Sequence, residues 1–475
     1  MKKDRIHEGP GPFLNRFKSS MLFLLRVATF ILCMACFFGL FGTKYPFLLR
    51  ASRTTGVVAV SFTVIYVLMT KIYGGVDVGK RKSKPIVFSL ALTLLFDDLI
   101  VHLLLCIMNT TVMHNGKFVY EYPALLLAVY LLQLLLAFIV AFGGNDLYFR
   151  VNRPQQCLVI ADNRENALRL IQKTNCFRRQ YDFQQIALIN QTDLLKMVDQ
   201  AEAVFLCNLS PDQKAYLVEY CFKTKKDLYF DPEVVDVIAL TEERVMFSDK
   251  TMIRCAAREM CYEERIVKRL GDVLISVLGL LLTSPILLLT ALAIWLEDHG
   301  PVFYRQARAT CNGKTFQVYK FRSMRQQDGH IHMSVTKNDS RITKVGRIIR
   351  KFRIDELPQL LNVLKGDMSI VGPRPEMVEN VKKYTEDFPE FRYRLRVKAG
   401  LTGFAQIYGK YNTPPKEKLL MDMTYIQQYS VWLDIKLILR TVLVLLTPEE
   451  STEAFEVKDD RRESSAKEQK ASGDY

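Results

Sequence analysis

Four long apolar stretches in the first third of the chain constrain its fold more than any other feature. They fall at about residues 20–42, 55–73, 86–108 and 123–142. As a helix, each is about long enough to cross a hydrocarbon core of roughly 30 Å. A cleaved signal peptide does not explain the first stretch, because it is too long and three more follow. Residues 1–150 are therefore predicted to form a four-helix transmembrane domain.

The distribution of basic residues predicts how these helices are oriented. Eleven Lys and Arg lie in the N-terminal tail, in the 74–84 loop and just after the last stretch, against four in the two opposite loops. Cytoplasmic loops carry the excess of basic residues. We therefore expect both ends of this domain, and everything after residue 150, to lie in the cytoplasm.

The net charge of +15 indicates an anionic partner. Nucleic acid, anionic lipid and a phosphorylated substrate all fit such a charge. The attached membrane segments favour lipid and nucleotide substrates. We find no groove-reading motif and no alternation of aromatic with basic residues. The sequence therefore predicts a protein that contacts the lipid bilayer and does not bind nucleic acid.

Polar residues inside the apolar stretches leave two interpretations open. Asp97, Asp98 and His102 lie within the third stretch, and ionisable residues in a bilayer are costly and often functional. Their spacing would let them pair within the bundle, so a structural role and a functional role both remain. Cys33 and Cys36 form a CxxC in the first stretch, where we interpret them as small packed residues.

A second region begins near residue 152, where short apolar strands alternate with polar-faced helices up to about residue 240. This βαβαβαβ pattern predicts a parallel, doubly wound sheet, so residues 151–260 are expected to form a Rossmann-like accessory domain. The first strand leads into Asp162 and Glu165 without a glycine, and both carboxylates would repel a pyrophosphate. We interpret this domain as a sensory or docking module.

An uncharged apolar run from Val273 to Trp295 is interrupted by Ser284-Pro285. A straight crossing would place the basic segment that follows outside the cell, where nucleotide-activated substrates are absent. Proline inside a helix removes a backbone hydrogen bond and favours a kink. We therefore expect residues 266–298 to form two helices around a break at Ser284-Pro285, re-entering the same leaflet. Ser284 or neighbouring helices would satisfy the freed carbonyl.

Two adjacent carboxylates, Asp355 and Glu356, follow a strongly basic segment. Residues 303–353 contain thirteen Lys or Arg against two Asp. The pair would therefore lie in a positive field suited to a multiply charged phosphate. An ordinary helix start is the alternative, with Asp355 as the N-cap, Glu356 in the first turn and Gly366 after the last turn.

The remaining elements are predicted from local patterns. Asn312-Gly313 indicates a hairpin turn, and short helices are expected near 341–351 and 356–365. The amphipathic stretch 431–446 would pack on the core or lie along the interface. Residues 447–475 contain few large apolar side chains and are predicted to be disordered.

The C-terminal part, about residues 263–446, resembles the bacterial sugar transferases, which are polyprenyl-phosphate phosphoglycosyl transferases. The four membrane segments and the central α/β module match the large members of this family. The resemblance rests on five spaced motifs, which are KFRSM at 320–324, DELPQL at 355–360, NVLKGDMS at 362–369, GPRP at 372–375 and GLTG at 400–403.

This resemblance implies an enzyme of the bacterial inner membrane. Such an enzyme moves a phosphosugar from a UDP-sugar to undecaprenyl phosphate, releases UMP and starts capsule, O-antigen or exopolysaccharide synthesis. Residues 261–446 would be a monotopic catalytic domain whose re-entrant helix places the site at the lipid surface. Carried onto this chain, Asp355 is the nucleophile of a covalent phosphosugar intermediate and Glu356 is a ligand of Mg²⁺.

The resemblance also implies basic ligands for the substrate. Arg350 and Arg374 would bind phosphate, a role that suits bidentate guanidinium groups. Lys320 and Arg322 would support binding of the phosphate or nucleotide, and a structural role on the solvated face is their alternative.

The chain departs from the family pattern at two places. Gln306 to Cys311 replace a more usual Glu-Arg-Val-Gly, and Lys398-Ala399-Gly400 lack a common proline. These departures concern loop shape and touch neither carboxylate. The transferred sugar stays open, and a homodimer is compatible with the sequence.

Two other function classes compete with the transferase. The first is a membrane-anchored scaffold or ligand sensor with an inactive transferase domain. The intact acid pair, Arg350 and Arg374 argue against it. The second is a transporter that uses Asp97, Asp98 and His102, but only one short membrane region carries charge and no repeat is visible.

Overall fold

The computed structural model describes residues 18–113, 118–239, 243–247, 249–255, 258–325, 341–410 and 413–446. The chain divides into two compact units. The first contains the chain up to Glu233 together with Ile435–Thr447, and the second contains Val234–Asp434. The predicted disorder of residues 447–475 lies outside the described residues.

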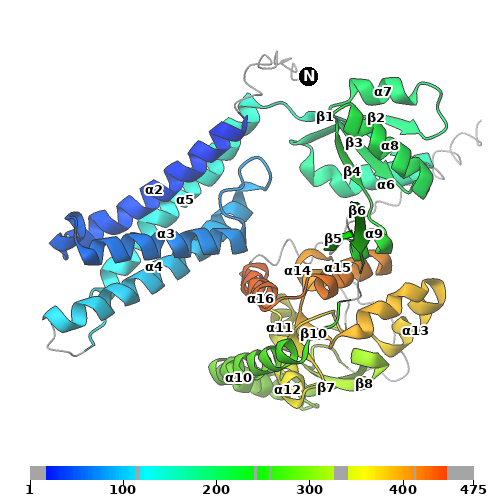
Figure 1. Cartoon of the computed structure of the whole chain (residues 1–475). Coiled ribbons are helices and arrows are strands. Elements are labelled where there is room, and N and C mark those ends of the chain that lie inside the picture. The colour runs from blue at the N-terminus through cyan, green and yellow to red at the C-terminus, as the bar shows by residue number, and fades with distance from the viewer. Residues whose placement is uncertain are drawn as a thin grey trace, which may run out of the picture. The chain divides into compact units, whose positions relative to one another are not determined.

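Four long helices form the membrane part of the first unit (Figure 1). They are α2 (Lys18–Gly42), α3 (Arg53–Tyr73), α4 (Ser83–Met113) and α5 (Pro123–Val151), with the 3₁₀ helix η1 (Pro46–Leu49) between α2 and α3. Each α-helix is long and apolar enough to cross a membrane. The four predicted apolar helices are therefore confirmed, and their length and composition are those of a multi-pass membrane protein.

The bundle core contains the three polar residues singled out in its third span. Asp97, Asp98 and His102 are fully buried. Gln133 of α5 donates from Nε2 to Oδ1 of Asp98 at 3.2 Å and to the Cys33 carbonyl oxygen at 3.1 Å. The His102 ring instead packs against aromatic rings. The partner of Asp98 thus comes from another helix rather than from His102.

A four-stranded parallel sheet with helices on both faces completes the first unit. The strand order is β2-β1-β3-β4, and all neighbouring strands are parallel. Helix α6 covers one face, while α7 and α8 cover the other. The elements are β1 (Gln155–Ala161), α6 (Arg164–Thr174), η2 (Asn175–Phe177), β2 (Tyr181–Leu188), α7 (Leu194–Gln200), β3 (Ala203–Cys207), α8 (Pro211–Lys223) and β4 (Asp227–Phe230). The predicted parallel sheet is confirmed.

The second unit holds the acid pair among short elements. In chain order its elements are α9 (Val234–Ala239), β5 (Glu243–Phe247), β6 (Lys250–Arg254), α10 (Tyr262–Asp298), β7 (Phe303–Ala309), η3 (Cys311–Gly313), β8 (Thr315–Phe321), α11 (Lys344–Lys351), η4 (Ile354–Glu356), α12 (Gln359–Lys365), β9 (Ser369–Val371), α13 (Val378–Asp387), η5 (Pro389–Arg396), β10 (Gly400–Thr402), α14 (Phe404–Tyr408), α15 (Pro415–Gln427) and the first four residues of α16 (Val431–Leu446). Strands β7 and β8 form the predicted hairpin, and α11 and α12 are the two predicted short helices.

Helix α10 corrects one prediction, because it is a single continuous helix of 37 residues and not two helices around a break. Pro285 lies inside it. A proline removes the hydrogen bond to the carbonyl four residues earlier, which here belongs to Leu281. The Ser284 hydroxyl donates to that carbonyl oxygen at 2.8 Å. The side-chain donor that was expected to satisfy the freed carbonyl therefore keeps the helix intact.

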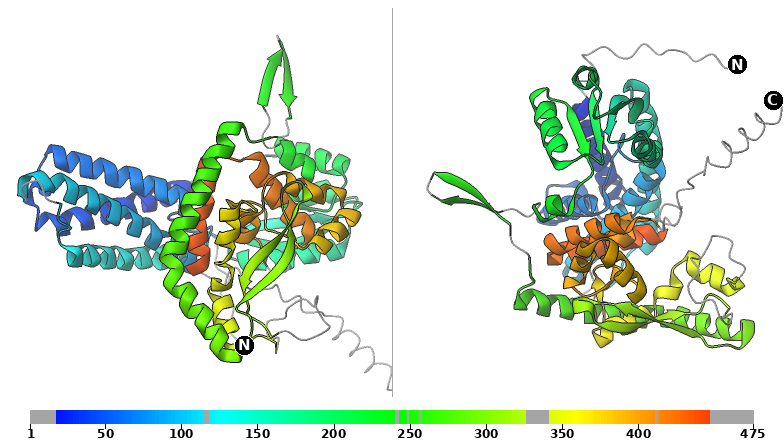
Figure 2. Two further views of the ribbon diagram at one scale, coloured as in Figure 1. Left: turned by 90° about the horizontal axis from the view of Figure 1, so that it is seen from below. Right: turned by 90° about the vertical axis from the view of Figure 1, so that its right-hand side faces the viewer.

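Both ends of α10 are anchored to the same folded body (Figure 2). Near its start, Arg269 donates to the carbonyl oxygens of Val363 and Leu364 at 2.6 and 2.7 Å. Near its end, the Glu297 carboxylate accepts from the backbone N–H of Lys344 at 2.8 Å. Between these anchors the helix exposes large apolar side chains, among them Leu274, Leu281, Leu282, Leu288, Leu289 and Leu292. This face is suited to lipid.

Most of helix α16 packs against membrane helices of the first unit, although residues 431–446 were predicted to belong to the catalytic domain. Leu439 and Leu443 pack against a cluster that includes Ile72 and Tyr73 of α3. Arg440 donates from Nε to the Ile72 carbonyl oxygen at 2.6 Å. The second half of α16 therefore belongs to the first unit.

Candidate active site

The acid pair lies in a tight turn between two helices. Asp355 and Glu356 form most of η4, which follows α11 and precedes α12. Arg353 enters the turn in the left-handed region at φ 55°, a conformation that a non-glycine residue adopts at a cost. Pro358 is the N-cap residue of α12, and no side chain caps that end. The helix-cap interpretation of Asp355 is therefore wrong.

Two cations converge on one oxygen of Glu356. Lys320 of β8 donates from Nζ to Oε1 at 2.9 Å, and Arg374 donates from Nη2 to the same oxygen at 3.1 Å. Burial alone would raise the pKa of Glu356, but these two cations outweigh it and hold the pKa well below the usual range. Glu356 is therefore a permanent anion near neutral pH.

Asp355 experiences a different environment although it is the adjacent residue. Burial and then the negative charge of Glu356 raise the pKa of Asp355 to about 6, while Lys320 and Arg350 oppose the shift. Among the described residues, no side chain is within hydrogen-bonding distance of its carboxylate. This carboxylate can therefore lose its proton near neutral pH, and no side chain in the described part of the chain has to be displaced before it attacks.

The other basic residues predicted for the site have different positions. Arg350, at the end of α11, acts on Asp355 through its charge. Arg322 instead forms an ion pair with Asp298 at the end of α10, with 2.8 Å between Nη1 and Oδ2. Arg322 is also buried, so its structural role is internal and not on the solvated face. The expected set therefore divides into Lys320, Arg374 and Arg350 toward the acid pair, and Arg322 away from it.

A crevice opens beside the acid pair. Its polar walls carry Arg308, Lys320, Glu356, Gln359 and Arg374, and Gly400 and Leu401 of β10 line it as well. Arg308 was not among the predicted residues, although its position on β7 opposite the KFRSM strand could have indicated it. Three cations around one crevice suit a diphosphate, which carries several negative charges.

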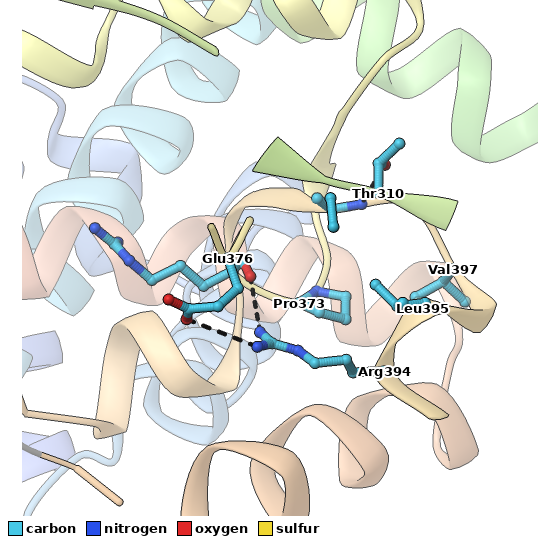
Figure 3. Close-up of a pocket in the computed structure, with 9 residues that line it drawn as sticks. Thr310, Pro373, Glu376, Arg394, Leu395 and Val397 are labelled. Atoms are coloured by element: carbon cyan, nitrogen blue, oxygen red, sulfur yellow. Dashed lines mark hydrogen bonds and ion pairs between the residues drawn. The ribbon is translucent and has the colours of Figure 1, made fainter. Parts of the chain in front are cut away.

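A second residue missed by the sequence analysis, Arg394, contacts the backbone of Arg374; Figure 3 shows Arg394 beside Glu376. Arg394 has only 2% of its surface exposed. It donates from Nη2 to the carbonyl oxygen of Arg374 at 2.7 Å, and the same nitrogen forms an ion pair with Oδ2 of Asp422 at 2.8 Å. Its Nη1 lies 3.8 Å from Oε2 of Glu376. Arg394 thereby fixes the backbone from which the Arg374 side chain extends. Its place in a basic run close to GLTG was the available signal.

Comparison with known proteins assigns this region to one group. Residues 263–448 match the family described as bacterial sugar transferase. The chain is 45% identical over 186 residues to a UDP-glucose:undecaprenyl-phosphate glucose-1-phosphate transferase of Caulobacter vibrioides, covering 38% of this chain and 70% of that protein.

The match covers different shares of the length of two further relatives. An Aeromonas hydrophila UDP-N-acetylgalactosamine-undecaprenyl-phosphate N-acetylgalactosaminephosphotransferase is 42% identical over 185 residues, which are 38% of this chain and 44% of that protein. The uncharacterized sugar transferase EpsL of Bacillus subtilis is 42% identical over 187 residues, which are 39% of this chain and 89% of that protein. The matched region is thus nearly the whole of one relative and less than half of another.

Proposed function

Because this chain belongs to the bacterial sugar transferase family, we propose that it transfers a sugar 1-phosphate from a UDP-sugar to undecaprenyl phosphate. UMP is the other product, and the lipid-linked sugar starts a polysaccharide. The observation that carries this proposal is the convergence of Lys320 and Arg374 on Glu356, beside the Asp355 carboxylate, which has no side-chain partner among the described residues. A crevice lined by cations next to an acid pair matches the needs of phosphoryl transfer.

The proposed first step is attack by a carboxylate oxygen of Asp355 on the sugar-bearing phosphorus of the UDP-sugar. A new bond forms between that oxygen and the phosphorus, while the bond from this phosphorus to the bridging oxygen breaks. UMP leaves with the electron pair. Arg308, Lys320 and Arg374 line the crevice and would neutralise the charge of the diphosphate as it is approached by an anion.

The proposed second step transfers the phosphosugar to the lipid. A phosphate oxygen of undecaprenyl phosphate attacks the phosphorus of the aspartyl intermediate, and the bond to Asp355 breaks. The carboxylate is thereby regenerated, and the product is an undecaprenyl diphosphate sugar. Arg350 and Arg374 are the proposed ligands for the two substrates' phosphates because a guanidinium can bind phosphate through two parallel hydrogen bonds.

Magnesium fits the acid pair only together with the substrate. Among the described residues, no group of three or more His, Cys, Asp or Glu could hold a metal ion. Mg²⁺ is commonly held by one or two carboxylates plus substrate phosphates. Oε1 of Glu356 is taken by two cations, which leaves its Oε2 and the Asp355 carboxylate as protein ligands. A bound Mg²⁺ would supply charge neutralisation between these carboxylates and the diphosphate.

The two anchored ends of α10 support a monotopic catalytic unit. A straight crossing would put the two ends of this helix on opposite sides of the bilayer. Arg269 and Glu297, which lie near the two ends, both bind the body that carries Asp355. We therefore propose that α10 enters the lipid only from the cytoplasmic side, with its exposed leucines in one leaflet.

UMP release tests the proposal. The purified full chain would be mixed with Mg²⁺, undecaprenyl phosphate and each member of a panel of UDP-sugars, alongside Asp355→Asn as the matched control. Release with at least one sugar and its loss in the variant are expected. No release with any sugar would favour an inactive transferase domain, and equal release by the variant would exclude Asp355 as the nucleophile.

A further inference from the structure

A small pocket lined by Thr310, Arg374 and Ala399, among others, brings together the two places where the chain departs from the family pattern, and Figure 3 shows where Thr310 lies in it. Thr310 belongs to the stretch Gln306–Cys311, which replaces a more usual Glu-Arg-Val-Gly, and Ala399 belongs to Lys398-Ala399-Gly400, which lacks a common proline. The backbone N–H of Ala399 donates to Oγ1 of Thr310 at 3.2 Å. Both residues are buried. The two departures are therefore in direct contact.

The Thr310 hydroxyl joins three segments of the second unit. It accepts from Ala399 and donates to the carbonyl oxygen of Asp367 at 2.9 Å. Thr310 itself directly follows β7, the strand that carries Arg308. One hydroxyl thus ties the end of the β7–β8 hairpin to the loop before β9 and to the segment before β10.

Ala399 lies at the start of one wall of the crevice. Its carbonyl oxygen accepts from the Ser369 N–H at 2.9 Å, and the N–H of the next residue, Gly400, donates to the Pro373 carbonyl oxygen at 2.8 Å. Gly400 and Leu401 line the crevice beside Arg374. The hydrogen bonds at Ala399 therefore set where this wall begins.

The chemistry of the two departures makes each depend on the other. A proline has no N–H and its ring fixes φ, so at position 399 it would need no acceptor and would restrain the backbone by itself. Alanine gives up that restraint and presents a buried N–H that must be satisfied. A glycine at position 310 could not accept a hydrogen bond from this N–H. The Thr310 hydroxyl accepts it, so a hydrogen bond replaces the restraint that a proline ring would give.

We propose that Thr310 and Ala399 are a coupled pair of positioning residues that holds the Gly400–Leu401 wall of the crevice in place for the donor UDP-sugar. Neither residue touches the acid pair in this arrangement. This inference rests on the proposed transferase function, because its main effect is on the use of the UDP-sugar.

The first test compares Thr310→Val with Thr310→Ser in the full chain. Valine keeps the shape of threonine and loses the hydroxyl, whereas serine keeps the hydroxyl. Thr310→Val is expected to raise KM for the UDP-sugar about three- to tenfold, the size expected for one lost buried hydrogen bond, with little change in kcat. Thr310→Ser is expected to remain within about twofold of the unsubstituted protein. A valine variant with unchanged KM, or a serine variant as impaired as valine, would overturn the proposal.

The second test is a double-mutant cycle with Thr310→Gly and Ala399→Pro. Each single change should lower kcat/KM, because one leaves the N–H of Ala399 without an acceptor and the other puts a ring against the Thr310 hydroxyl. The double variant has neither problem. Its kcat/KM is expected to be about fivefold or more above the value obtained by multiplying the two single effects. If the loss of kcat/KM in the double variant equals the product of the two single losses, the pair is not coupled.

Apparent melting temperatures of the same variants separate this inference from the proposed function. If the unsubstituted protein released no UMP from any UDP-sugar, the proposed function would fail, while non-additive melting temperatures would still support the coupling. Equal melting temperatures for all four proteins of the cycle would overturn it. A lowered melting temperature in Thr310→Val with an unchanged KM would reduce the pair to a purely structural contact and overturn the positioning role.

Discussion

The guanidinium Nη2 of Arg374 lies 3.1 Å from Oε1 of Glu356, and this contact makes two neighbouring carboxylates chemically different. Together with Lys320, it keeps the pKa of Glu356 well below the usual range against the opposing effect of burial. Burial and the charge of Glu356 raise the pKa of Asp355 to about 6. One carboxylate is therefore a fixed anion, and the other titrates close to physiological pH.

Activity should depend on pH through Asp355. The nucleophile must be ionised, so kcat/KM is expected to rise with an apparent pKa of about 6 and then reach a plateau. Below that pKa it should fall about tenfold per pH unit, because one proton blocks the attack. The measurement is the pH profile of UMP release at a low concentration of UDP-sugar. A profile that stays flat down to pH 5 would contradict the prediction.

A control is needed because burial also raises the pKa of Asp422 to about 6. Asp422→Asn should keep the acidic limb of the profile if Asp355 is responsible for it.

The raised pKa of Asp355 also predicts the sign of a stability effect. The folded-state pKa of Asp355 lies above its usual value, so the protonated form stabilises the fold at low pH. This contribution is lost as pH rises through about 6 and should be absent in Asp355→Asn.

Replacing Glu356 with Gln should impair catalysis and its dependence on metal. The change removes the anion that Lys320 and Arg374 share and one proposed ligand of Mg²⁺, so kcat should fall about 100-fold or more. UMP release measured over a range of Mg²⁺ concentrations checks this. A variant that keeps the original half-saturating Mg²⁺ concentration would show that Glu356 is not a ligand.

Lys320 and Arg322 stand two residues apart and should respond differently to substitution with Met. Lys320→Met removes a cation from the crevice and is expected to lower kcat/KM about 100-fold, with a smaller loss of stability than in Arg322→Met because Arg374 still pairs with Glu356. Arg322→Met removes the partner of the partly exposed Asp298 carboxylate, so stability should fall by about 1 to 2 kcal/mol. Thermal unfolding and UMP release, measured on both variants, separate the two roles.

The matched control for Arg322→Met is the double variant that combines Arg322→Met with Asp298→Leu. Removing both charges of the ion pair leaves no unpaired carboxylate, so the double variant should recover much of the lost stability. A double variant no more stable than Arg322→Met would mean that the ion pair with Asp298 is not the source of the loss.

Reporter fusions should distinguish a re-entrant α10 from a crossing one. Alkaline phosphatase is active only outside the cytoplasm. A fusion after residue 330 is expected to be inactive, and one after residue 120, in the loop between α4 and α5, should be active. Activity at 330 would mean that α10 crosses the bilayer and would place the acid pair outside.

Deleting residues 1–150 should leave the transfer reaction intact. Asp355, Glu356 and the cations around them lie in the second unit, so the chemistry does not require the four spans. Removing α3 would uncover Leu439 and Leu443 of α16, and lower yield in detergent is the expected cost. UMP release per mole of purified protein is the measurement. Complete loss of release in a folded variant would assign the bundle an essential role.

The sequence alone determined those features that depend on local composition. A continuous apolar stretch of about 20 residues can satisfy its backbone in lipid only as a helix, so the four spans followed directly. The alternation of strands and helices likewise fixed the parallel sheet, and Asn312-Gly313 fixed the hairpin. The acid pair could be named from its basic neighbourhood and its motif, but the same residues also fitted a helix start.

The tertiary structure decided the features that depend on residues distant in the sequence. It selects Lys320 and Arg374 as partners of Glu356 and assigns Arg322 to Asp298, although Lys320 and Arg322 belong to the same motif. It also pairs Asp98 with Gln133. Which side chains meet is set by packing across elements, and their distances in turn set the pKa values. The charge pattern of the sequence does not show which side chains will meet. The different roles of Asp355 and Glu356 therefore become visible only in the folded protein.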